Sequence, residues 1–200
     1  MGNLLTISFS LFCLLSITTC THRWVAHPQG VPGYERCDIW KDDIQMLKIP
    51  GFELSYIIVR DCFSAPREKV SIAMMVFLDV WKKHHSQFSY EEVEDQLNQT
   101  LVEFSDQTRL VNAYDRDGNY IQNASANGLT ITKGMVWVKL QPGQLLCESS
   151  LAHELIHVAI WTNKKTDADP DHLGTKYAGW DQTKELVLQE TNRRLCELGI

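Results

Sequence analysis

The sequence predicts an α+β fold, with a small mixed sheet packed on a backing helix, on a second buried helix and on a C-terminal helix. Three observations lead to this fold class. The chain has 200 residues, which suits one compact domain with little room for a second. Residues 52–60 and 135–140 have the pattern of strands, the latter by alternation. Residues 66–85 and 151–160 carry the apolar residues of largely buried helices.

The N-terminal stretch 4–19 contains no charged residue and is rich in Leu, Ile and Phe. Its length and position favour the apolar region of a signal peptide over a bilayer-spanning helix. Cys20 follows Ile17-Thr18-Thr19, which is similar to a bacterial lipoprotein processing site. Residues 1–20 are therefore expected to be a signal peptide, of the ordinary or the lipoprotein type. The protein would be secreted, or held at the cell envelope by a lipidated Cys20; an uncleaved membrane anchor is the alternative.

Residues 21–50 are expected to form an N-terminal arm, because Pro and Gly are frequent in their first half. The folded domain is then expected to span residues 51–200. Its first helix, 66–85, is preceded by Ser64-Ala65-Pro66, which supplies a cap and a proline for the first turn. The sequence Ser89-Tyr90-Glu91-Glu92 has the capping-box pattern and predicts a short helix to about residue 103.

A hairpin is predicted where residues 109–114 and 120–122 flank the turn sequence Asp-Arg-Asp-Gly-Asn. Residues 123–127 are polar and resemble a turn. The strand at 135–140 leads into the helix that begins near Leu151, and we expect this strand to be the edge along which an extended peptide could pair. A final helix is predicted at 181–198.

Four cysteines follow residue 20, and in an exported chain they predict two disulfides. Three pairings are possible. We favour Cys37–Cys62 and Cys147–Cys196, of which the second would join the start of the helix near Leu151 to the C-terminal helix.

The formal net charge of −6 and the pI near 5.6 argue against nucleic acid as a partner, because nonspecific nucleic-acid binding requires a basic face. The Lys and Arg residues are also scattered along the chain.

The sequence HELIH at 153–157 stands on the second predicted buried helix. His153 and His157 are four residues apart, so their imidazoles lie on one helical face and can meet one Zn²⁺ at about 2.0–2.1 Å each. Glu154 lies about 100° around the helix, within reach of a metal-activated water without being a ligand. The motif therefore predicts two zinc ligands and one general base.

A catalytic zinc site usually has three protein ligands. His172 is the leading candidate, since the loop after the HELIH helix is long enough to fold back over it. The alternatives are three carboxylates of the predicted C-terminal helix, Asp181, Glu185 and Glu190, or no third protein ligand at all.

The pattern His153-Glu154-x-x-His157, then fourteen residues, then His172, resembles the zincin metallopeptidases, and its spacing is similar to that of SprT-like proteins. This resemblance covers about residues 150–180. It implies a single zincin-like domain, one Zn²⁺ per chain on the three histidines, Glu154 as the base and a peptide or protein substrate. It does not imply the DNA-associated targets of SprT-like proteins, because this chain is expected to be exported.

Hydrolysis of an amide also calls for a hydrogen-bond donor to the oxyanion. Tyr177 is the nearest candidate by sequence, and Tyr114 or the backbone of Trp137 would serve as well.

The function expected from these residues is that of a small exported zinc peptidase. One alternative is an envelope-associated binding or structural protein whose metal only stiffens the fold. A second is a zinc amidase that acts on cell-wall peptide. The sequence predicts neither the substrate nor the oligomeric state.

Overall fold

The structure is a computed structural model of the chain, and it describes residues 26–27, 44–60, 67–106, 108–114, 120–141, 143–165 and 180–200. Several predictions fall outside this described part: the signal peptide at 1–20, the disulfide Cys37–Cys62, the zinc ligand His172 and the oxyanion donor Tyr177.

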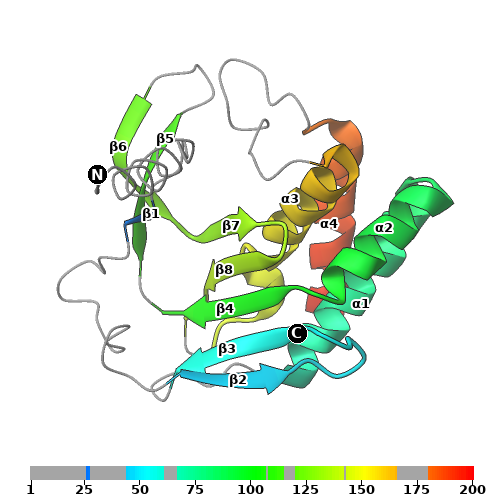
Figure 1. Cartoon of the computed structure of the whole chain (residues 1–200), viewed down its shortest axis with the longest axis horizontal. Helices are drawn as coiled ribbons and strands as arrows, with labels where there is room; N and C mark the ends of the chain where they lie inside the picture. The colour runs from blue at the N-terminus through cyan, green and yellow to red at the C-terminus, as the bar shows by residue number, and fades with distance from the viewer. Residues whose placement is uncertain are drawn as a thin grey trace, which may run out of the picture.

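A five-stranded mixed sheet organises the domain (Figure 1). Its spatial order is β2 (Ile44–Lys48), β3 (Tyr56–Arg60), β4 (Leu101–Ser105), β8 (Met135–Lys139) and β7 (Gly128–Thr132). Strands β3, β4 and β8 are parallel to one another. The two edge strands, β2 and β7, run antiparallel to their neighbours.

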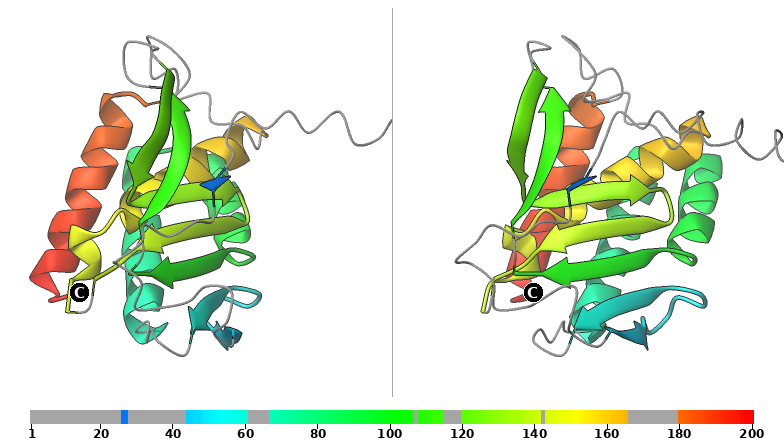
Figure 2. Two further views of the ribbon diagram at one scale, coloured as in Figure 1. Left: turned by 90° about the vertical axis from the view of Figure 1, so that its left-hand side faces the viewer. Right: turned by 60° about the vertical axis from the view of Figure 1, so that its left-hand side comes forward.

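The four α-helices of the described part lie on one side of this sheet: α1 (Arg67–His84), α2 (Gln87–Leu97), α3 (Leu151–Lys164) and α4 (Gln182–Glu197) (Figures 1 and 2). Helix α4 packs on α1 and α3. The core forms where the helices meet the two central strands, whose alternate side chains Val102, Phe104, Val136 and Val138 are fully buried. The expected α+β class with a mixed sheet is therefore confirmed. No helix in the described part is both long enough and apolar enough to cross a bilayer.

The opposite face of the central strands is covered by the start of a hairpin. Strands β5 (Arg109–Tyr114) and β6 (Tyr120–Ala126) pair with each other, and β5 also pairs with the short β1 (Ala26–His27). Arg109 lies 3.0 Å from a carboxylate oxygen of Glu103 and 4.7 Å above the ring of Trp137. From there the hairpin projects past the β7 edge of the larger sheet (Figure 2).

Helices α1, α3 and α4 confirm their predictions to within a few residues. The helix predicted at 89–103 is wrong at both ends. It begins after Ser86, whose hydroxyl accepts a hydrogen bond from the backbone N–H of Ser89, and it ends at Leu97. The chain beyond it forms the central strand β4.

Two further strands occupy segments that were expected to be irregular. Residues 44–48, placed in the N-terminal arm, form edge strand β2 and pair with all of β3. Residues 123–126, expected to be a turn, continue β6 to Ala126. Strand β7, which has no counterpart in the prediction, follows after one intervening residue.

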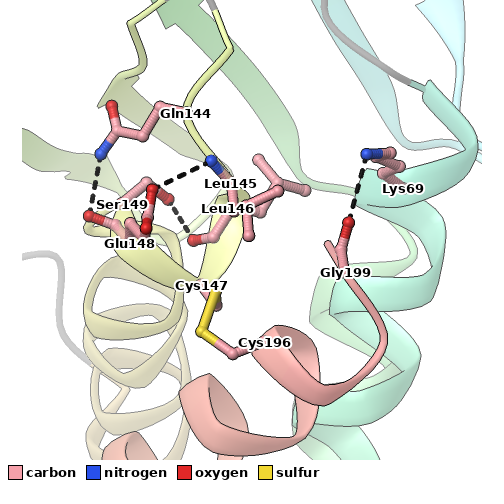
Figure 3. Close-up of a disulfide and its surroundings, with 9 residues drawn as sticks. All are labelled: Lys69, Gln144, Leu145, Leu146, Cys147, Glu148, Ser149, Cys196 and Gly199. Atoms are coloured by element: carbon pink, nitrogen blue, oxygen red, sulfur yellow. Dashed lines mark hydrogen bonds between the residues drawn. A yellow bond between two sulfur atoms is a disulfide. The ribbon is translucent and has the colours of Figure 1, made fainter.

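The predicted disulfide Cys147–Cys196 is confirmed, and its two Cα atoms are 5.4 Å apart (Figure 3). It joins the 3₁₀ turn Leu146–Glu148, which directly precedes α3, to the last turn of α4. Two hydrogen bonds lie beside it: the N–H of Cys147 donates to the carbonyl of Ile200, and Lys69 of α1 donates to the carbonyl of Gly199.

Candidate metal centre on helix α3

Helix α3 is apolar around almost its whole circumference. This suits its position, because it packs against β7 and β8 of the sheet and also against α1, α2 and α4. Its residues from Leu151 to Trp161 are buried except for His153, which is half-buried. The helix is capped by Lys165, whose left-handed backbone (φ 53°, ψ 44°) directs its N–H back to the carbonyls of the last turn. Polar side chains in such a helix need specific partners.

The two histidines of HELIH converge as their spacing predicts. The Nε2 atoms of His153 and His157 are 3.0 Å apart, and their ring planes meet at 74°. Two nitrogens bound to one tetrahedral ion at 2.0–2.1 Å would be separated by about 3.3–3.4 Å. The pair is therefore within a few tenths of an ångström of the spacing that zinc requires. The same distance also suits a hydrogen bond from one imidazole to the other.

Glu154 is 4% exposed, and its carboxylate lies against edge strand β7. The hydroxyl of Thr130 is 2.9 Å from the carboxylate oxygen Oε2 and 3.1 Å from the main-chain oxygen of Glu154. Gly128, two residues earlier on the strand, leaves room for the other carboxylate oxygen, since a Cβ there would lie 2.4 Å from Oε1.

Trp180, at the start of α4, forms a wall of the site. Its indole ring stacks on His153 with the ring centroids 4.6 Å apart, and its centroid is 5.3 Å from that of His157. Its Nε1–H points to Glu185, 3.4 Å away. The indole thus gives the imidazole pair an aromatic, low-dielectric neighbour.

The three α4 carboxylates considered as third ligands have other partners. Asp181 caps α4 through the N–H of Lys184 and pairs with its ammonium group. Glu185 accepts a hydrogen bond from Gln189 at 2.8 Å. Within the described residues no group of three His, Cys, Asp or Glu side chains is arranged to hold a metal ion. None of these carboxylates therefore completes the His153–His157 pair in this structure.

Glu190 is the α4 carboxylate with the strongest partners. It lies 2.8 Å from the ammonium of Lys83 and 3.0 Å from Nε2 of His84, both at the end of α1. These two hydrogen bonds lower the pKa of Glu190 to about 2. His84 therefore helps to join the end of α1 to α4.

The strand expected to offer an edge to a peptide does not do so. Strand β8 is interior, because it pairs with β4 on one side and β7 on the other. The backbone of Trp137, in the middle of β8, is for the same reason a poor oxyanion donor. Among the described strands, the edge of this sheet next to α3 is β7, which pairs with β8.

Sequence reasoning missed three residues that surround HELIH: Gly128, Thr130 and Trp180. The β-branched residues of Gly-Leu-Thr-Ile-Thr could have indicated a strand at 128–132. No local pattern indicated that Trp180 would reach the histidines.

Comparison of the chain with family models, with curated proteins and with solved structures found no match.

Proposed function

We propose that this protein is an exported zinc-dependent peptidase with a zincin-like domain. In this proposal His153 and His157 bind one Zn²⁺, His172 supplies the third ligand, and Glu154 is the general base. The substrate is a peptide or protein in an extended conformation.

The observation that carries the proposal is the 3.0 Å separation of the two Nε2 atoms on the helix that also bears the buried carboxylate of Glu154. Two imidazoles and a carboxylate on adjacent faces of one buried helix are costly unless they have polar partners. A divalent cation satisfies both imidazoles at once, and neutral imidazole nitrogen is a preferred zinc donor.

Bound zinc would supply a Lewis acid that polarises the scissile carbonyl and makes water nucleophilic near neutral pH. Glu154 accepts a proton from the attacking water on a carboxylate oxygen and later returns it to the leaving amine nitrogen. Trp180 excludes solvent from one side of the imidazole pair. The outer edge of β7, the edge strand of the described sheet, offers backbone donors and acceptors to a substrate strand beside Glu154.

The first test is the zinc content of the purified protein without residues 1–20, measured by elemental analysis. We expect about one zinc per chain, with much less in His153→Ala and in His172→Ala. His84→Ala is the matched control, because this histidine pairs with Glu190 away from the site and its loss should leave zinc unchanged. Glu154→Gln should retain zinc and lose cleavage of a peptide library.

The other outcomes discriminate between the alternatives. An unchanged zinc content in His172→Ala would indicate that an α4 carboxylate, and not His172, is the third ligand. Zinc that supports thermal stability but no hydrolysis would indicate a structural metal, and cleavage restricted to cell-wall peptides would indicate an amidase. A complete absence of zinc would refute the proposal and favour the envelope-associated binding protein.

A further inference from the structure

Two residues of strand β7 contact Glu154 from the side opposite its own helix. Gly128 and Thr130 are two positions apart, so they face the same side of the strand. That side faces α3, because the Thr130 hydroxyl reaches the main-chain oxygen of Glu154 at 3.1 Å and its carboxylate at 2.9 Å.

The carboxylate lies close to the strand backbone. An added Cβ at Gly128 would lie 2.4 Å from Oε1 of Glu154 and 2.2 Å from the hydroxyl of Ser150. Both distances are far below van der Waals contact, so any side chain at this position would displace the carboxylate or the start of α3. One oxygen of Glu154 therefore depends on the absence of a side chain at 128, and the other accepts a hydrogen bond from residue 130.

The hydroxyl of Thr130 can have two different roles. A bond to the main-chain oxygen would only attach strand to helix, whereas a bond to Oε2 would also determine where the carboxylate points. A hydroxyl bonds more strongly to an ionised acceptor than to a neutral carbonyl, and the carboxylate is also the nearer acceptor. The geometry therefore favours the second role.

We propose that Thr130 is a positioning residue that holds the carboxylate of Glu154 in its working orientation, in the space that Gly128 leaves open. This inference rests on the proposed role of Glu154 as general base. It makes the same strand responsible for substrate pairing and for the orientation of the base.

The test compares Thr130→Val, which keeps the shape and removes the donor, with Thr130→Ser, which keeps the donor. Thr132→Val is the matched control on the same strand, because the hydroxyl of Thr132 contacts the turn at Gly134. In the zinc-loaded protein Thr130→Val should lower kcat by about tenfold to a hundredfold, as expected for a lost hydrogen bond to a charged group. KM and zinc content should be unchanged, Thr130→Ser should restore kcat, and Thr132→Val should have no effect.

A second readout does not depend on activity. In protein carrying ¹³C-labelled glutamate, the carboxyl signal of Glu154 is the one that is missing from Glu154→Gln. At constant pH this signal should shift or broaden in Thr130→Val and return in Thr130→Ser. An unchanged signal in Thr130→Val, or a rise in KM without a fall in kcat, would overturn the inference even in an active peptidase. A shifted signal in a protein that hydrolyses nothing would support the contact and refute the proposed function instead.

Discussion

Removal of the Cys147–Cys196 disulfide should destabilise the protein by several kcal/mol without changing its fold. The two cysteines are 49 positions apart, so the bond closes a loop of about 50 residues. For a loop of this length the chain-entropy relation gives about 14 cal/mol/K, or about 4 kcal/mol at 25 °C, because the unfolded chain loses conformations when it is cross-linked. For a protein of this size the melting temperature should fall by about 8–16 °C.

The assay is urea denaturation of the double variant Cys147→Ala/Cys196→Ala beside the parent protein, both without reductant. Alanine suits the buried position 147 because it introduces no polar group. Reductant added afterwards to the double variant reports whether Cys37 and Cys62 form the second predicted disulfide. A loss below about 1 kcal/mol would refute the reasoning, since it would mean that the cross-link hardly restricts the unfolded chain.

Three other predictions concern the core, the contact between α1 and α4, and the wall of the site. Leu155→Ala should cost about 2–5 kcal/mol in urea denaturation, because the side chain is 1% exposed, whereas Leu186→Ala, at a position 46% exposed, should cost less than about 0.5 kcal/mol. The pKa of Glu190 is lowered from 4.5 to about 2 in the folded state, so its contribution to stability is present above pH 4.5 and is lost as the pH falls toward 2. In metal-free protein, the melting temperature of Glu190→Gln should therefore change less with pH between 4.5 and 2 than that of the parent protein. An equal pH dependence of the two melting temperatures would contradict the lowered pKa of Glu190. Trp180→Phe should reduce the quenching of tryptophan emission by Co²⁺, a paramagnetic ion, because this indole stacks on His153 at 4.6 Å, and Trp161, 6.5 Å from His157, should account for the quenching that remains; quenching of unchanged amplitude would place the ion elsewhere.

The long helices could be predicted because their apolar periodicity extends over many turns. Near residue 100 the same periodicity led to a wrong prediction of helix. Leu97 and Leu101 continue the spacing of a helix, but Leu101 begins a strand. That strand is buried on both faces, although Glu103 and Ser105 alternate with the apolar residues beside them. An alternation over so few residues was outweighed by the helical spacing of the leucines that precede it.

The candidate site, like the fold, could be predicted from the sequence only in part. HELIH could be read from the sequence because an interval of four residues determines which side chains share a helical face. The contacts of Glu154 with Thr130 and of His153 with Trp180 could not, since each joins segments whose distance depends on the packing of the sheet and the helices. The residues of 128–132 could have indicated a strand, but nothing in them indicates that Gly128 and Thr130 face Glu154.

The disulfide has a consequence for proteolysis. Residues 147–196 form one covalently closed ring, and this ring contains HELIH, His172 and Trp180. A single proteolytic cut between residues 166 and 179 would leave both halves in one molecule. Such a nicked chain would migrate as one band on a non-reducing gel and as two bands after reduction. The His153–His157 pair and Trp180 would remain tethered to each other through Cys147 and Cys196.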